Sequence, residues 1–364
     1  MRFSILCFLA IFIGTISAGQ IKDSIPSLSC NEYTLFESDE LLEICLKGDI
    51  RKLFKDRGDN AVYHPFQFTF GIEGISQSVD IRVKTRGNFR KLRENCRIPP
   101  LLLNFDSLPN SGGKLFYQQN KLKLVTACQN EKYVLREYLA YKIYQLVSEK
   151  SFCVRLVTIC FEDSEKGKTT DPKYGILLED QNCMAERNQS RLVKRLNLNP
   201  KKTDREMFLK MAVFQFLIGN TDWSIQYLHN IKLISGVQNA ALIPVPYDFD
   251  HSGIVDTPYA LPAEELQMRS VRQRRYRGYC LRNMEDFEST FAVFKDAKED
   301  IYNLYKNSHL LEEDYIKSTL KYLDEFYDII SDKKKSKRAF QYPCNKYGTG
   351  NVVIKGINKI KPNK

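Results

Sequence analysis

The sequence predicts an α+β fold with two lobes: a β-rich N-terminal lobe over residues 19–180 and a mainly helical C-terminal lobe over 181–335. Two changes of hydrophobic period lead to this prediction. From about residue 65 apolar and polar residues alternate, as in strands, whereas residues 131–148 repeat apolar residues every three to four positions, as in a helix. Beyond residue 185 the helical period dominates.

The first eighteen residues resemble a targeting segment. Residues 1–18 combine one basic residue, a short apolar run and small residues at the exit, which indicates a cleaved secretory signal peptide. No later segment approaches the roughly 18 apolar residues of a membrane span, so we expect no transmembrane segment. The mature protein should be extracytoplasmic: secreted, periplasmic or in the secretory pathway.

Cysteine content fits that compartment. Cleavage would remove Cys7 of the 10 cysteines and leave an odd number, so we expect several disulfides and at least one unpaired thiol. Cys153 and Cys160 share one predicted strand and would lie about 23 Å apart, too far to pair with each other. The sequence does not indicate the other pairings.

The chain is basic, with a formal net charge of +11, and 43% of its residues are hydrophobic. This apolar content suffices for a large core. The charge favours anionic partners such as nucleotides or acidic proteins, although a solvated basic surface explains it equally well. Nucleic acid is not an expected partner, because the net charge is the one feature of the sequence that favours it. Residues 336–364 should form a loose basic tail.

Alternation predicts the strands of the N-terminal part at residues 66–72, 78–87, 98–105, 120–127, 152–162 and 173–180. In the fourth strand Lys121 and Lys123 share one face. The intervening helix, 131–148, carries an apolar stripe of Leu135, Leu139, Ile143 and Leu146. One helix on a mostly antiparallel sheet, followed by a chain crossing at Glu179, is the layout of a kinase small lobe.

In the C-terminal part, Thr203-x-x-Glu206 predicts a capping box, and Gly219 a C-cap for the helix that follows it. A hairpin of residues 228–234 and 241–246 comes next. Two apolar stripes then predict two late helices, the first with Phe287, Phe291, Phe294 and Ile301, and the second with Ile316, Leu320, Leu323, Tyr327 and Ile330.

The candidate site is the stretch 219–253, which places Asp222 just after a helix and Asp248 and Asp250 just after a hairpin. Phosphoryl transfer needs a positioned hydroxyl and neutralised phosphate charge more than covalent help. Asp222 could accept the proton of the hydroxyl. Asp248 and Asp250, two apart in an extended segment, could share a hard cation. Each acid could instead be an ordinary turn residue.

The sequences GNTDWSIQYLHN (219–230) and PYDFDHSG (246–253) resemble the CotH family of atypical kinases and, more distantly, the HipA kinases and the secretory-pathway Golgi casein kinases. The resemblance covers roughly residues 65–255 and includes RGN at 86–88. It implies a two-lobed protein-kinase-like fold that holds ATP and Mg²⁺ or Mn²⁺ between its lobes.

By position, the resemblance assigns a role to each candidate. Asp222 would orient the acceptor hydroxyl, Asp248 or Asp250 would bridge metal and phosphates, and Glu179 would lie beside the adenine. Asn230 would be the metal-binding amide. It lies eight residues after Asp222, where many kinases have five, so Gln226 or no amide at all stays an alternative.

The phosphate-binding lysine should lie in the strand before the helix. Lys123 is the first candidate and Lys121 the second, with Glu137 of the helix as the partner. A solvated strand face is the other explanation of both lysines. Downstream, six arginines between 269 and 282 could bind phosphate or lie on an ion-paired surface. His229 and His251 are interpreted as structural.

The sequence therefore predicts an exported atypical kinase that transfers the ATP γ-phosphate to a hydroxyl of a protein, including an acidic one, or of another hydroxyl-bearing acceptor. One alternative is a catalytically inactive kinase-fold binding or scaffold protein, which the displaced Asn230 favours. A further alternative is a basic polyanion-binding protein, favoured by charge alone.

Overall fold

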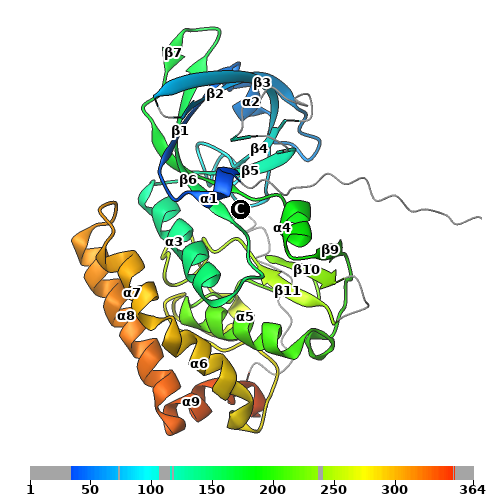
Figure 1. Cartoon of the computed structure of the whole chain (residues 1–364), viewed down its shortest axis with the longest axis vertical. Coiled ribbons are helices and arrows are strands. Elements are labelled where there is room, and N and C mark those ends of the chain that lie inside the picture. The colour runs from blue at the N-terminus through cyan, green and yellow to red at the C-terminus, as the bar shows by residue number, and fades with distance from the viewer. Residues whose placement is uncertain are drawn as a thin grey trace, which may run out of the picture.

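The structure, a computed structural model, describes residues 34–72, 74–105, 115–116, 119–236, 241–346 and 348. The predicted signal peptide, 1–18, lies outside the described residues. Figure 1 shows a barrel of strands at one end of the molecule and a second part, with most of the helices and a small sheet, at the other. Helix α3 (Lys132–Val147) lies between them.

The barrel is built from an eight-stranded sheet in the order β1-β2-β3-β4-β5-β8-β6-β7. Neighbouring strands are antiparallel, and β1 also pairs with β6 in parallel, which closes the sheet into a ring of seven strands with β7 attached to β6. The strands are β1 (Leu42–Gly48), β2 (His64–Ile72), β3 (Ile75–Thr85), β4 (Leu101–Asn104), β5 (Lys121–Thr126), β6 (Val154–Asp163), β7 (Lys168–Thr169) and β8 (Lys173–Leu178). Two short helices, α1 (Thr34–Glu37) and α2 (Ile50–Lys55), accompany them.

Alternating side chains fill the barrel. Along β2, Phe66, Phe68 and Phe70 are buried, and they belong to one apolar cluster with residues of every other strand of the ring. On β5 the inward residues are Leu122 and Leu124, so the lysines of that strand point out of the barrel. Burial of one face of each strand fixes the register of the ring.

The predicted fold class is wrong. The N-terminal sheet is not open, because β1 joins both β2 and β6 and closes it. The C-terminal part is not mainly helical either, since the described residues between 218 and 287 form loops, two strands and short 3₁₀ turns. A two-lobed protein-kinase-like fold therefore does not describe this chain. Local periodicity could not reveal the closure, because the β1–β6 pairing joins segments 115 residues apart, as Cys45 and Cys160 mark.

Helix α3 is buried nearly all round, because it is covered by β6 and β8 on one side and by α7 (Lys298–Lys306) on another. Three residues of its predicted stripe are buried, but Leu146 is 40% exposed. Two charged residues of α3 are buried as well: Glu137 is 1% exposed and Arg136 is 7% exposed. A charged side chain buried to this degree requires partners, and those of Glu137 lie in the candidate site.

The second part contains a three-stranded antiparallel sheet in the order β11-β10-β9. Its elements are α4 (Gln181–Arg187), β9 (Ser190–Val193), η1 (Pro200–Lys202), α5 (Arg205–Leu217), β10 (Ile231–Gly236), β11 (Ile243–Pro246), η2 (Glu264–Leu266), η3 (Met284–Phe287), α6 (Glu288–Asp296), α7, α8 (Glu313–Ser331), α9 (Lys333–Phe340) and η4 (Tyr342–Cys344). The strands β10 and β11 form the predicted hairpin.

Three local predictions need correction. Asp204, not Thr203, caps α5 by accepting a hydrogen bond from the Met207 N–H at 2.9 Å. The first late helix is two helices, α6 and α7, that meet at Ala297. Residues 336–344 of the predicted tail belong to the fold, because α9 and η4 continue it to residue 344.

Three disulfides join described cysteines: Cys45–Cys160, Cys96–Cys128 and Cys280–Cys344. Cys153 is a free thiol. This pattern is consistent with the oxidising compartment that the sequence predicts. Within the described ranges, every helix is too short or too polar to cross a membrane.

Candidate functional site

A cleft of about 520 Å³ lies where the loop after β3 faces the two ends of the β10–β11 hairpin. Four residues singled out from the sequence line it together: Asp222, Asn230, Asp248 and Asp250. The other lining residues are Arg86, Gly87, Asn88, Phe89, Arg90, Leu92, Glu94, Asn95, Pro100, Leu228, His229, Tyr247 and His251. The fold thus brings the two acidic loops to one cavity.

Backbone hydrogen bonds hold these two loops together. The Gly253 N–H donates to the Gly219 carbonyl at 3.1 Å, and the Ile254 N–H donates to the Ile218 carbonyl at 2.9 Å. Gly219 has φ +69°, and a Cβ there would lie 2.3 Å from the Tyr322 hydroxyl oxygen. Only glycine fits that position, so the predicted C-cap also allows the two acidic loops to touch.

Asp222 is held from three sides. His229 Nε2 lies 2.8 Å from its Oδ1, Asn230 Nδ2 donates to its Oδ2 at 3.1 Å, and its own N–H donates to Asn220 Oδ1 at 2.9 Å. Behind it, Arg277 donates to the carbonyl of Trp223 at 2.7 Å. The Asp222 carboxylate is therefore oriented, as a general base must be.

His229 was interpreted as structural, yet it contacts the candidate base directly. Burial of the ring disfavours the charged imidazolium, but the hydrogen bond and charge of Asp222 outweigh it, so that the pKa of His229 is raised. Asn230 is also committed to Asp222 through its amide nitrogen, at 2.9 Å from the Asp222 carbonyl and 3.1 Å from the carboxylate. Of the Asn230 side chain, only the amide oxygen Oδ1 is left for a cation.

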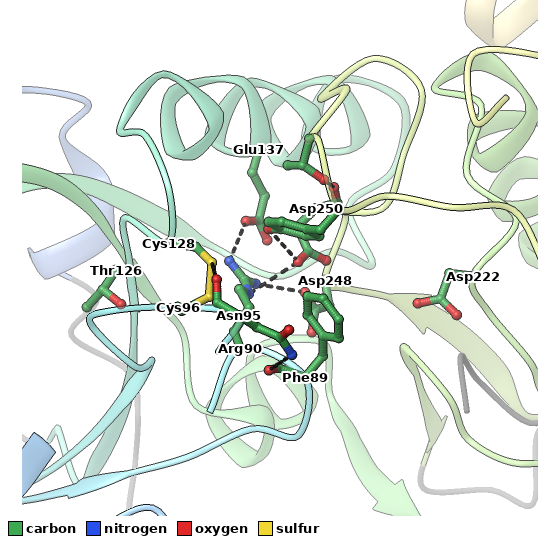
Figure 2. A network of polar contacts seen from close by, with 12 residues as sticks. Phe89, Arg90, Asn95, Cys96, Thr126, Cys128, Glu137, Asp222, Asp248 and Asp250 are labelled. Atoms are coloured by element: carbon green, nitrogen blue, oxygen red, sulfur yellow. Dashed lines mark hydrogen bonds and ion pairs between the residues drawn. A yellow bond between two sulfur atoms is a disulfide. The ribbon is translucent and has the colours of Figure 1, made fainter. Parts of the chain in front are cut away.

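The second acidic loop meets helix α3 at a single guanidinium. Arg90 contacts Glu137 Oε2 at 3.2 Å, Asp248 Oδ1 at 3.0 Å and Asp250 Oδ2 at 3.2 Å (Figure 2). Tyr259 also donates its hydroxyl to Asp250, at 3.0 Å. Figure 2 shows Asp222 apart from this cluster, on the side of Asp248. Glu137 therefore pairs with Arg90, and its predicted pairing with Lys123 is wrong.

The cluster carries more negative than positive charge. Burial raises the pKa of Glu137 to about 8, against the opposing charge of Arg90. Burial and Asp250 raise the pKa of Asp248. The pKa of Asp250 is lowered, because Arg90 and other neighbours outweigh its burial. With its pKa of about 8, Glu137 is largely protonated at pH 7, so the excess negative charge comes from Asp248 and Asp250, which share one guanidinium. A divalent cation would balance that excess.

Asp248 has φ +66°, a left-handed backbone that is uncommon for a residue other than glycine. Its N–H donates to the Tyr141 hydroxyl of α3 at 2.8 Å, and the Tyr141 ring packs on Phe249 at 4.6 Å between ring centres. The segment is therefore not extended, as the sequence suggested. Helix α3 instead fixes the backbone that aims Asp248 at Asp250 and Arg90.

The donor set fits a metal that arrives with phosphates better than a resident metal. In the described part of the chain, no three His, Cys, Asp or Glu side chains come together as a metal-binding group. Asp248 and Asp250 alone offer two carboxylates. Mg²⁺ in phosphoryl-transfer sites is bound by one or two carboxylates, with phosphate oxygens and water completing its shell. The residues present fit that arrangement.

Three cations without an ion pair lie near the aromatic ring of Tyr247, next to Asp248. Lys123 Nζ is 4.8 Å and Lys232 Nζ 5.2 Å from the ring centre. Arg86 lies close enough to lower the pKa of both lysines. None of the three forms an ion pair with a described residue. Unpaired cations held together in this way are ready to bind an anion with several charges.

Of the two candidate lysines, Lys123 faces this cluster and Lys121 is exposed. Burial lowers the pKa of Lys123 from 10.5 to about 7, and the charges of Arg86 and Lys232 add to the effect. Between these two pKa values the unfolded chain binds a proton that the folded protein lacks. Burial of Lys123 therefore lowers the free energy of unfolding by an amount that grows as the pH falls from 10.5 to 7.

We predict that Lys123→Met stabilises the protein at pH 7 by at least about 1.4 kcal/mol, the equivalent of one pKa unit. The gain should shrink towards pH 9.5, because the wild-type penalty shrinks there. Urea unfolding at both pH values measures it. Lys121→Met, on the same face of β5, is the matched control and should change little. A gain for Lys123→Met that does not depend on pH would contradict the prediction.

Two other sequence-based candidates have structural contacts. Glu179 is 1% exposed, and its carboxylate accepts hydrogen bonds from Arg187 and from the Cys153 N–H at 2.8 Å. It ties β8 to β6 and α4, and its carboxylate is committed to these contacts. In the arginine-rich stretch, Arg274 and Arg277 donate to backbone carbonyls. These two arginines position chain segments and are not displayed for phosphate.

Arg86, Arg90 and Lys232 are site residues that the sequence analysis did not single out. Arg86 was noted only within the RGN sequence at 86–88, and no pattern in the single sequence distinguishes Arg86, Arg90 or Lys232 from other basic residues. The acids were found because they flank a hairpin, which brings its two ends together locally.

Comparison with known proteins adds little to this site. No family model matches the chain, and no curated protein matches it. Among solved structures it is similar to the proinflammatory kinase CtkA of Helicobacter pylori, with 15% identity, a TM-score of 0.38, and coverage of 70% of this chain and 94% of that chain. A likeness this weak carries no argument. Membership of the CotH family stays a prediction from the sequence.

Proposed function

We propose that this protein is an exported phosphotransferase that moves the γ-phosphoryl group of ATP, with Mg²⁺ or Mn²⁺, to a hydroxyl of a protein acceptor. The observation that supports this function best is the composition of the cleft. It contains an oriented carboxylate, Asp222, and two carboxylates that share a single guanidinium and so have a deficit of positive charge. Beside the cleft, Lys123 and Lys232 lie around Tyr247 and, with Arg86 of the cleft wall, form a group of cations without an ion pair to a described residue, which has a deficit of negative charge. A nucleoside triphosphate with its metal satisfies both deficits.

Each group then has a part in the reaction. Asp222 accepts the proton of the acceptor hydroxyl as that oxygen attacks the γ-phosphorus. Lys123, Arg86 and Lys232 bind the phosphate oxygens and stabilise their charge. Asp248 and Asp250 would hold the divalent cation, which would neutralise charge on the phosphates. His229 and Asn230 keep the Asp222 carboxylate pointed into the cleft.

Nucleotide binding should depend on the metal. Trp223 is the single tryptophan, is 4% exposed and follows Asp222 directly, so its fluorescence should report on the cleft. We predict that ATP with Mn²⁺ changes this emission and that ATP with EDTA does not. Equilibrium dialysis with labelled ATP checks the same point without depending on the fluorophore. The proposed function fails if dialysis detects no metal-dependent ATP binding.

The remaining alternatives give different outcomes. A binding protein without transfer activity would bind the metal–ATP complex but would not label any acceptor with γ-³²P. A polyanion-binding protein would bind inorganic polyphosphate with a strong salt dependence and would not require a divalent cation. Labelling of casein or myelin basic protein, an acidic and a basic model acceptor, would support the transferase.

A further inference from the structure

Arg90 lies where an additional cation would be expected between the acids of the cleft. Its three guanidinium nitrogens each face a different carboxylate: Nη1 faces Glu137, Nη2 faces Asp248 and Nε faces Asp250, all at 3.0–3.2 Å. The side chain is 11% exposed. This is a complete, buried set of charge-assisted contacts and differs from a mobile surface arginine.

The loop that carries Arg90 is built to keep it there. Asn95 Nδ2 donates to the Phe89 carbonyl at 2.8 Å, and the neighbouring Cys96 is bonded to Cys128 after β5 (Figure 2). The Phe89 ring packs on His251 and Tyr259, with ring centres 5.6 and 5.2 Å apart. The loop is thus fixed to the barrel on one side and to the second acidic loop on the other.

The guanidinium uses only part of each aspartate. Arg90 contacts Oδ1 of Asp248 and Oδ2 of Asp250, and Tyr259 also uses Oδ2 of Asp250. Because the two carboxyl groups also hydrogen-bond to each other, the oxygens that remain can hold at most one metal ion. A second ion against the same carboxylates would have to enter the space between Glu137, Asp248 and Asp250, which Arg90 fills.

We propose that Arg90 replaces one of the two metal ions that such a carboxylate pair could hold, so that the cleft binds a single divalent cation per nucleotide. This inference rests on the proposed function, since the nucleotide supplies the rest of the metal's ligands. The guanidinium supplies fixed positive charge beside the phosphates, and the one metal supplies the remainder. Glu137 completes the site from α3 by binding Arg90 instead of a metal.

Removing the guanidinium should therefore create a second metal site. Arg90→Met keeps the length of the side chain and removes its charge, leaving three carboxylates together. Glu137 Oε1, already buried without a partner in the described structure, would be a further ligand. We expect Mn²⁺ electron paramagnetic resonance, with a non-hydrolysable ATP analogue, to count one bound ion in the wild type and two in Arg90→Met.

Arg136→Met is the matched control. Arg136 lies on α3, is 9% exposed in its side chain and pairs with Glu312 at 3.2 Å, outside the cleft. The control should still bind one ion, although it too loses an arginine ion pair. Mn²⁺ should also raise the melting temperature of Arg90→Met more than that of the wild type or the control, because the ion replaces the lost charge.

Two ions in the wild type, or one in a folded Arg90→Met, would overturn the inference and leave the proposed function standing. If Arg90→Met does not fold, the wild-type count still decides between one and two ions. Absence of any nucleotide-dependent Mn²⁺ binding would instead remove the proposed function, and this inference with it.

Discussion

Asp222→Asn is expected to lower phosphoryl transfer by a factor of about 10²–10⁴, the usual contribution of a positioned general base. The substitution keeps the shape of the side chain. The new amide oxygen can accept from Asn230, and its nitrogen can donate to Nε2 of neutral His229, so both contacts of the carboxylate are preserved. What is lost is the ability to accept the proton of the hydroxyl.

Affinity for the metal–ATP complex should stay within about threefold, or roughly 0.7 kcal/mol, because other groups contact the phosphates. The two measurements are γ-³²P transfer to casein or myelin basic protein and equilibrium dialysis with Mn²⁺ and ATP. A variant that retains wild-type transfer would exclude Asp222 as the base. One that loses nucleotide binding as well would indicate a metal-binding or structural role.

The positions of the acids could be predicted from the sequence because their convergence is local. Asp222 and Asp248 lie at the two ends of a single hairpin, and a hairpin returns the chain to where it started. Six strands of the barrel, β2 to β6 and β8, were equally visible, since residues such as Phe66, Phe68 and Phe70 alternate with polar residues. Short-range pattern is sufficient for both results.

The closure of the barrel could not be predicted in this way. Strand β1 was not among the predicted strands, and its partner β6 lies more than a hundred residues further along the chain, as the Cys45–Cys160 separation of 115 shows. No period in the sequence connects the two strands. The closure is thus set by a long-range parallel pairing, which the predicted, mostly antiparallel sheet did not include.

The partners of the charged side chains were also beyond the sequence. An ion pair of Glu137 with Lys123 was predicted because Lys123 lies on the strand before the helix and Glu137 lies within it. In the structure Glu137 pairs with Arg90, which comes from an irregular loop. Arg277 looked like a surface charge and is used to hold the Trp223 carbonyl. Which cation meets which anion depends on loop conformation, and residue type does not encode it.

Asp248→Asn should weaken binding of the metal–ATP complex at least thirtyfold, or about 2 kcal/mol, because a metal ligand loses its charge. The backbone should tolerate it, since asparagine adopts the left-handed conformation that Asp248 has at φ +66° more readily than most residues. Arg90 would still pair with Glu137 and Asp250. Dialysis with Mn²⁺ and ATP measures the loss of affinity.

Asp256→Asn supplies a matched control, because Asp256 also has a left-handed backbone, at φ +56°, but pairs with Arg272 at 3.6 Å outside the cleft. Its nucleotide affinity should not change. Without ligand, Asp248→Asn should be no less stable than the wild type. Burial raises the pKa of Asp248, so the ionised carboxylate costs stability at neutral pH, and the neutral amide removes that cost. A purely structural Asp248 would give the reverse, with stability lost and affinity retained.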